Sequence, residues 1–553
     1  NVPATVQAAI AARIDRLSNA ARRTLNAASV IGARFDAALL AALDSDAVVD
    51  ELLSAELIDQ VRFTPSAEYA FFHPLIRAVT YESQLKSDRA ELHQRVAAAI
   101  ESRDPAAAEE NAALIAEHLQ AAGELHAAYQ WHMRAATWAT YRDIAAARQS
   151  WERAQAIAEA LPDQDPNRTA MRIAPRIMLC GIAWRVQVDV AGDRFEELRE
   201  LCTAAGDKSS LAIAMAGLVI DHGFRGRIRE ASRLASEAWA LIESIDDPTL
   251  AVGLSFPVIY AKAHKGEWGH VLRWSQSVID LADGDPSKGN FMFGSPLALA
   301  LATRAVGRYC LGRPGWRDDL RHGLAMARSA DPLSYAIVVA YVYFPGIPLG
   351  ALAAHDAAMR ELEDAQRIAE RSGDDMAVVF ARAIPGLALV HRHTDAERDR
   401  GRKLLDEVSD LILRRGHSLS ELRLINVYLA RERARRGDHD RAITLMFAAV
   451  DQLVREGQLL SWGIPATGVL VETLLDRGAE GDVAAAEAVI ERLAAAPADG
   501  GLVIRDIWLL RLRALLARAH SDEASYRDYR DRYRAMATAL GLEGHLAYAG
   551  AMP

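Results

Sequence analysis

The stretch Gly437-Asp438-His439-Asp440-Arg441-Ala442 joins a glycine and an acidic turn to a small residue on the next helical run. The same arrangement recurs at Gly123–Ala128, Gly226–Ala231, Gly481–Ala484 and Asp522–Ala524. Breaks in the helical pattern fall near Gly226, Gly266, Gly312, His355, Asp395, Gly437, Gly481 and Asp522, at intervals of about 43 residues. A period this steady is typical of stacked helical hairpins.

The interval exceeds the roughly 34 residues of a standard tetratricopeptide repeat (TPR). We therefore expect residues 104–553 to form a TPR-like α-solenoid of enlarged helical hairpins, open and elongated. Antiparallel helices approach closely only where side chains are small, so each alanine after a break is expected at a helix crossing.

Prolines and tryptophans recur through this region. Pro257, Pro296, Pro345, Pro385 and Pro465 are expected to bend helices or to begin them. The segments Phe256-Pro257, Phe344–Pro348 and Ile384–Gly386 either line the concave surface of the array or only set its curvature. The tryptophans either fill the core between repeats or contribute in part to a ligand groove; they are Trp131, Trp138, Trp151, Trp184, Trp239, Trp268, Trp274, Trp316, Trp462 and Trp508.

Residues 1–103 have a different pattern. Helical periodicity, with Pro3 near its start, runs through Val6–Leu17, and further helices are expected at Ala20–Ile31, Phe35–Leu43, Val48–Glu56, Pro74–Leu85 and Asp88–Glu101. Between them, Leu57–Phe63 and Glu68–Phe72 are β-rich and flank a turn that contains Pro65, with Val61, Phe63, Tyr69 and Phe71 as apolar residues. Helices leading into one β-hairpin predict a winged-helix domain, so the expected fold class is all-α with a single hairpin.

The composition favours a globular protein that works away from membranes and nucleic acid. The 553 residues have a formal net charge of -10, only three cysteines and no apolar run of about 18 residues. We expect no membrane span, no disulfide framework, no nucleic-acid partner and a cytoplasmic location. The chain begins at Asn1, and we expect it to be an internal or C-terminal piece of a longer protein.

Catalytic motifs are absent from the sequence. It contains no phosphate-binding Gly-x-x-x-x-Gly-Lys-Ser/Thr loop, no His-Glu-x-x-His and no Gly-x-Ser-x-Gly. His118, His126 and His132 straddle the break at Gly123, so we expect surface histidines there rather than a metal site. No catalytic residue, metal ligand or cofactor is predicted within this chain, which is not expected to be an enzyme by itself.

Several N-terminal segments resemble bacterial signalling ATPases of the STAND class. The resemblance runs through Val2–Leu17 and Ala27–Phe35, is strongest at Phe71-Phe72-His73-Pro74-Leu75-Ile76-Arg77-Ala78-Val79-Thr80-Tyr81-Glu82-Ser83-Gln84-Leu85, and continues through Arg89–Glu101. It covers about the first fifth of the chain and corresponds to that family's winged helix and the helices after it.

The resemblance implies an ATPase core that binds ATP or ADP upstream of residue 1, and a TPR-like array that senses a ligand. In relatives of the maltose-regulon activator the effector is a C-terminal LuxR-type helix-turn-helix. Here we expect Tyr526–Leu540 to be the last helix of the array, followed by a short tail and not by such a domain. The effector is therefore expected upstream; in actinobacterial proteins of this type it is commonly a class III adenylate or guanylate cyclase.

The resemblance also implies a role for His73, as a contact to the nucleotide phosphate in the closed, ADP-bound state of the parent. Imidazole can donate a hydrogen bond to a phosphate oxygen. The alternative is that His73 caps the next helix, with Pro74 at its first position.

We thus predict the regulatory, ligand-sensing and protein-interacting region of a signal-transduction ATPase that controls an upstream cyclase. Its partners would be its own ATPase and effector domains, and an unknown protein or small molecule on the array. One alternative is a transcription regulator whose winged helix binds DNA through Arg13, Arg16, Arg22, Arg23 and Arg34. The other is a plain TPR scaffold.

Overall fold

The computed structural model describes residues 4–44, 46–64, 66–103, 107–140, 142–181, 193–290, 294–372, 375–416, 419–498 and 501–553. Within these ranges lie 29 helices and one three-stranded sheet. The chain forms two compact units, Asn1–Leu179 and Cys180–Pro553. None of the helices in the described ranges combines the length and apolar character needed to cross a membrane.

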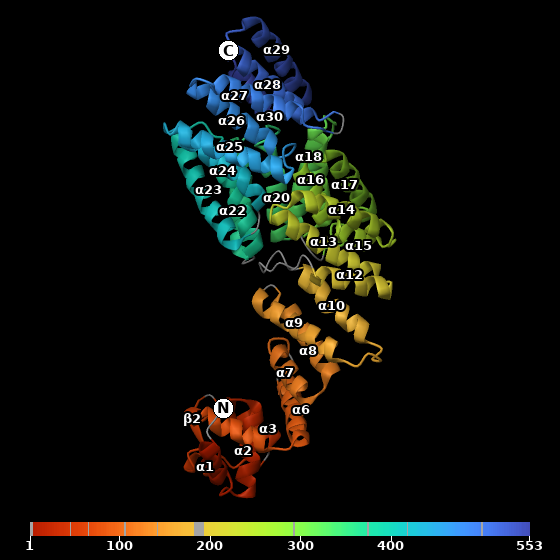
Figure 1. Cartoon of the computed structure of the whole chain (residues 1–553), viewed down its shortest axis with the longest axis vertical. Helices are drawn as coiled ribbons and strands as arrows, with labels where there is room; N and C mark the ends of the chain where they lie inside the picture. The colour runs from red at the N-terminus through yellow and green to blue at the C-terminus, as the bar shows by residue number, and fades with distance from the viewer. Residues whose placement is uncertain are drawn as a thin grey trace. The chain divides into compact units, whose positions relative to one another are not determined.

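The first unit holds the sheet and the helices coloured red to orange in Figure 1. Its elements are α1 (Ala4–Ile14), α2 (Asn19–Ile31), β1 (Arg34–Asp36), α3 (Ala37–Leu43), α4 (Val49–Ser54), β2 (Ile58–Arg62), β3 (Glu68–Phe71), α5 (Pro74–Ser83), α6 (Lys86–Arg103), α7 (Ala112–Ala122), α8 (Leu125–Ala139), α9 (Ile144–Ala160) and α10 (Arg168–Gly181), which runs past the unit's end.

The sheet has one strand more than the sequence predicts. The expected hairpin β2–β3 is present, but β1 pairs antiparallel with β3, giving the order β1-β3-β2. The prediction of a helix from Phe35 is wrong because the Asp36 side chain accepts a hydrogen bond from Leu39 N and caps α3, which starts at Ala37. Pro3 and Pro65, both named in the predictions, lie outside the described residues.

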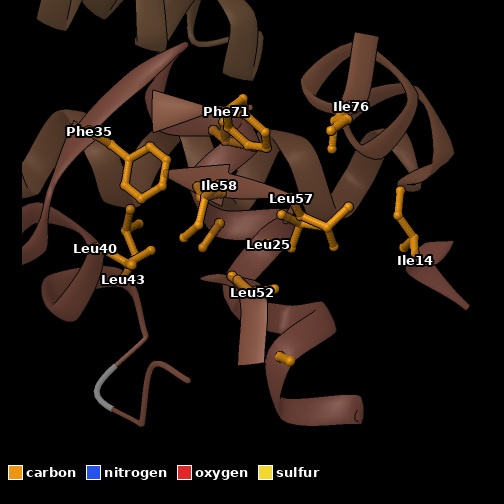
Figure 2. Packing of buried hydrophobic residues seen from close by; sticks show 14 of the residues in the cluster. Ile14, Leu25, Phe35, Leu40, Leu43, Leu52, Leu57, Ile58, Phe71 and Ile76 are labelled. Carbon is orange, nitrogen blue, oxygen red and sulfur yellow. The ribbon is translucent and has the colours of Figure 1, made fainter. Parts of the chain in front are cut away.

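Around this sheet lies the apolar core of the first unit. Figure 2 shows Leu25, Leu52, Leu57 and Ile58 converging beneath the strands, and all four are fully buried. Phe71 is buried as well, whereas Val61 and Phe63 are 47% and 72% exposed. The far end of the hairpin therefore extends beyond the core, and these two apolar residues lie outside it.

Helix α6 belongs to two cores. Its Val96 packs in the core beneath the sheet, while its neighbour Ala97 packs with Ala112 and Ile115 of α7. Successive helices α6 to α9 then pack each against the next. The change from sheet to helical hairpins takes place along one helix, and the predicted domain boundary at residue 103 stays a prediction.

The second unit is a run of helical hairpins. Its elements are α12 (Asp193–Ala205), α13 (Lys208–Phe224), α14 (Ile228–Glu243), α15 (Pro248–Gly253), α16 (Ser255–Lys265), α17 (Trp268–Ala282), α18 (Pro296–Cys310), α19 (Trp316–Ala330), α20 (Pro332–Gly346), α21 (Asp356–Ser372), α22 (Asp375–Leu389), α23 (Asp395–Arg415), α24 (Leu419–Ala434), α25 (His439–Glu456), α26 (Gly463–Arg477), α27 (Asp482–Ala494), α28 (Val503–Ala519), α29 (Glu523–Leu540) and α30 (Glu543–Ala551). Paired helices such as α13 with α14 and α24 with α25 confirm the expected hairpin repeat.

The glycine at each break and the alanine after it have the predicted geometry in most repeats. Gly226 and Gly437 have φ of 76° and 95°, a left-handed conformation that glycine adopts without strain. Ala231 and Ala442 are fully buried at the following crossings, as expected. Ala484 and Ala524 are exposed, so that prediction is wrong for the last two hairpins.

The array of the second unit closes on itself. Helix α13 contacts α24, and α18 contacts α28. Trp268 Nε1 donates to Leu460 O at 3.1 Å, and Trp508 Nε1 donates to Leu349 O at 3.1 Å. The expectation of an open solenoid is thus wrong for this unit, because small rotations between repeats add up and return late repeats to early ones.

Candidate functional site

An apolar cavity lies inside the second unit, where the returning helices meet the earlier ones. Its wall comes from α16, α17, α18, α20, α22, α23 and α24, together with Trp462 just before α26. About 80 Å³ of the cavity is open to the centres of water-sized molecules. Val271, Val306 and Ile425 are among its apolar lining residues.

Two of the helices that form this wall contain an internal proline. Pro345 and Pro385 lie inside α20 and α22, where a proline removes a backbone hydrogen bond and bends the helix. Phe344, Pro345 and Ile384 line the cavity. The inward-facing interpretation therefore holds for Phe344–Pro348 and Ile384–Gly386 but not for Phe256-Pro257, which does not line this cavity. Pro296 instead begins α18, the other behaviour expected of these prolines.

The tryptophans divide between both expected roles. Trp268 and Trp462 line the cavity, as a ligand groove would require. Trp151 is fully buried in the first unit, as a core residue would be. Trp184 lies outside the described residues.

A cluster of polar side chains meets at one wall of the cavity. Glu421 Oε1 accepts a hydrogen bond from Tyr260 OH and is also hydrogen-bonded to His264 Nε2, each at 3.0 Å. Glu421 Oε2 accepts from Ser420 Oγ at 2.5 Å. His264 is 3% exposed, and the Glu421 side chain is 18% exposed on the cavity wall. The cluster therefore places one carboxylate in an otherwise apolar space.

The hydrogen-bond partners determine where the protons are. His264 Nδ1 lies 3.0 Å from Tyr260 O, and a carbonyl oxygen can only accept, so Nδ1 carries a proton. One further proton must lie between His264 Nε2 and Glu421 Oε1, on either atom. The pair is neutral overall in both cases.

Burial and hydrogen bonding act in opposite directions on this cluster. Burial acts to raise the pKa of Glu421, but the hydrogen bonds from His264, Ser420 and Tyr260 outweigh it and keep that pKa below its usual value. Burial, followed by the nearby Glu421 charge, raises the pKa of Tyr260 well above its usual value. Tyr260 therefore stays protonated and serves as a donor.

No sequence signal pointed to this cluster. His264 and Glu421 are 157 residues apart, and neither belongs to a motif with the spacing of a catalytic or metal site. The segments Phe344–Pro348 and Ile384–Gly386, with the tryptophans, were the only hints that this part of the array has an inner surface.

His73 lies outside this site, in the first unit. Its Nδ1 accepts a hydrogen bond from Leu75 N at 3.1 Å, so it caps α5, with Pro74 in the first turn. The capping alternative is therefore observed. Since Nδ1 accepts, the neutral ring carries its proton on Nε2, and the side chain is exposed.

The three histidines near Gly123 are not all on the surface. His118 and His132 are 6% and 0% exposed, which corrects the expectation of surface residues, and His118 Nδ1 lies 2.8 Å from His93 Nδ1. His126 instead pairs with Asp165 at 2.9 Å. In the part of the chain that the structure describes, no group of three or more His, Cys, Asp or Glu side chains could hold a metal ion.

Comparison with known protein families and with curated proteins finds no match to the sequence. Solved structures show distant likenesses. One is a signal transduction ATPase with numerous domains (STAND) protein with a tetratricopeptide repeat sensor, from Pyrococcus horikoshii, at 14% identity and a TM-score of 0.41; the match covers 79% of this chain and 63% of that one, less than two thirds of its length.

Two further structures are similar over most of this chain. A Rap protein complexed with competence and sporulation factor matches at 12% identity and a TM-score of 0.37, over 76% of this chain and 99% of that one. The Cut9–Hcn1 hetero-tetramer of the APC/C matches at 12% identity and a TM-score of 0.39, over 86% of each chain.

Proposed function

We propose that this chain is the sensor and regulatory region of a signalling ATPase, and that its helical array binds a ligand in the cavity of the second unit. The observation that carries the proposal is the apolar cavity with the Glu421–His264 pair on its wall. Cavities of this type, mostly apolar with a few convergent polar groups, are typical of ligand sites. A plain scaffold would have no need of one.

We further propose that the N-terminal domain is a winged helix. Its element order α2-β1-α3-α4-β2-β3 and the sheet order β1-β3-β2 support this assignment. The proposed upstream ATPase and nucleotide cyclase depend on the sequence resemblance, which is strongest at Phe71–Leu85.

DNA binding by this domain is the weaker alternative. In a helix-turn-helix the second helix enters the major groove, and α4 would hold that place. It has only six residues, Val49–Ser54, with Asp50 and Glu51 in its first turn and no basic side chain. Such a helix would repel the phosphate backbone.

The cap on α5 is compatible with a nucleotide contact at His73. Nδ1 is used by Leu75 N, which leaves the Nε2 proton to donate to a phosphate oxygen. The two alternatives for His73 therefore do not exclude one another, and one residue can serve both purposes.

The test uses the full-length parent and the rate of ADP release. His73→Ala removes a hydrogen bond to a charged group, worth about 1.5–3 kcal/mol, so ADP release should speed up roughly tenfold to a hundredfold. Effector output without ligand should rise with it.

The matched control is His73→Asn, because asparagine is a good N-cap and keeps the bond to Leu75 N. It should restore the thermal stability that alanine loses but should release ADP as fast as His73→Ala. An unchanged ADP release rate in both variants would leave His73 with capping alone and would refute the proposed switch.

A further inference from the structure

The Glu421 carboxylate on the cavity wall has one acceptor position that no side chain among the described residues uses. An ionised carboxylate offers about four acceptor positions. Glu421 uses at most three of them, for His264, Tyr260 and Ser420. One position on Oε2 is left for a donor.

The same wall carries a donor without a partner. Trp462 lines the cavity and is 5% exposed, and its Nε1 has no hydrogen-bond partner among the described residues. Its ring stands edge-on to His264, with centroids 5.3 Å apart. A buried N–H left unpaired costs about 1–3 kcal/mol, so this position favours a group that accepts from it.

Charge restricts the kind of group further. The His264–Glu421 pair is neutral overall, because one proton lies between the two side chains. A charged ligand would enter an apolar space with no free counter-ion and would be strongly disfavoured. The complementary group is therefore uncharged and both donates and accepts, which is what a hydroxyl does.

We propose that the cavity binds a small, uncharged, apolar molecule with one hydroxyl group, which donates to Glu421 and accepts from Trp462 Nε1. This proposal rests on the proposed sensor function and specifies the ligand's chemical class. The apolar part of the molecule would lie against Val271, Phe344 and Ile425.

The size of the cavity sets the size of the molecule. A space of about 80 Å³ open to the centres of water-sized molecules holds roughly five to eight water-sized groups. A two-ring hydrocarbon with one substituent is of this size, whereas a sugar chain or a peptide is too large and too polar.

Four probes with one ring system test the class by calorimetry on the whole chain: 1-naphthylmethanol, 1-methylnaphthalene, 1-naphthylmethylamine and 1-naphthoic acid. The alcohol should bind at one site. It should bind roughly three- to tenfold more tightly than the hydrocarbon, as one or two net hydrogen bonds allow, and the amine and the acid should bind more weakly still.

Three variants locate the site. Ala383→Phe fills the cavity and should abolish binding of the alcohol, whereas Glu363→Gln, at an exposed position on α21, should not change it. Trp462→Phe keeps an aromatic wall without the N–H, so the alcohol should lose part of its advantage over the hydrocarbon, which should bind as before.

Equal affinity for the alcohol and the hydrocarbon, preference for the acid or the amine, or binding that survives Ala383→Phe would each overturn the proposal. Failure of the ligand class is separable from failure of the function. If no probe binds while His73→Ala still speeds ADP release in the parent, only the ligand class is wrong. If His73→Ala leaves release unchanged while the alcohol binds as expected, the switch at His73 fails and the ligand class stands.

Discussion

His545 shows at the scale of one residue how the array is held closed. It is fully buried; its Nε2 donates to Leu349 O at 3.0 Å, and its Nδ1 accepts from Tyr533 OH at 2.9 Å. Both nitrogens are thus used by the neutral ring. Burial, followed by the nearby Arg511 charge, lowers the pKa of His545 to about 3.

This lowered pKa predicts a loss of stability in mild acid. Between about pH 6.5, where an unfolded histidine titrates, and pH 3, the unfolded chain binds a proton that the folded chain does not. The free energy of unfolding should therefore fall with pH, by about 2 kcal/mol at pH 5 for this residue alone. Urea unfolding at pH 7 and pH 5 measures it.

His545→Asn should be less stable than the native chain at pH 7 and should lose about 2 kcal/mol less between pH 7 and pH 5. The control is His520→Asn, at an exposed position, which should leave the pH dependence as it is. An identical pH dependence in His545→Asn would show that this ring is protonated in the folded state.

At the scale of the element, the crossing of α26 and α28 depends on a missing side chain. A Cβ at Gly468 would overlap the ring of Trp508. Gly468 therefore lets α28 approach closely enough for Trp508 Nε1 to reach Leu349 O.

Gly468→Ala should lower the free energy of unfolding by about 1–3 kcal/mol, because an added methyl group must push the Trp508 ring aside. Gly550→Ala in α30 is the matched control, since a Cβ there meets nothing within 4 Å. It should be neutral or stabilise the helix by up to about 1 kcal/mol. Urea unfolding, monitored by circular dichroism, compares the two variants. Equal effects would contradict the claim that α26 and α28 need a glycine where they cross.

The sequence predicted these elements well where the cause is local. Glycines with positive φ end helices, and Pro296 begins one, because these preferences belong to the residue itself. Strand β1 was missed because it gains its partners from β3, more than thirty residues later in the chain. Val61 and Phe63 alternate as strand residues should, but which part of a hairpin covers a core is not a local property.

At the scale of the second unit, closure links parts of the chain that are far apart in sequence. Leu349 accepts hydrogen bonds from Trp508 and His545, 159 and 196 residues later. Close to these two bonds, Glu543 N donates to Ala351 O at 3.0 Å. In an open array each repeat would contact only its neighbours.

Because the array is closed, removing the Trp508 N–H should affect a segment that is far away in the sequence. Trp508→Phe removes the bond to Leu349 O but keeps an aromatic ring, so amide exchange in Ile347–Ala351 should speed up roughly twofold to tenfold. Hydrogen exchange read out by mass spectrometry measures this. Trp239→Phe is the control, because Trp239 Nε1 bonds within its own helix, to Glu243 at 2.8 Å. Faster exchange confined to α26–α29 in Trp508→Phe would instead indicate an open array.

The sequence by itself determined the hairpin repeat, its period, most helix boundaries and the β-hairpin, because periodicity, glycine and proline act over a few residues. For the segments that contain Phe344, Pro345 and Ile384 it left two alternatives open, an inner surface or a role in curvature alone. Only the tertiary structure decided that the array closes and that His264 and Glu421 meet in a cavity. The reason is physical: closure is the sum of small rotations over many repeats, and no local pattern records that sum.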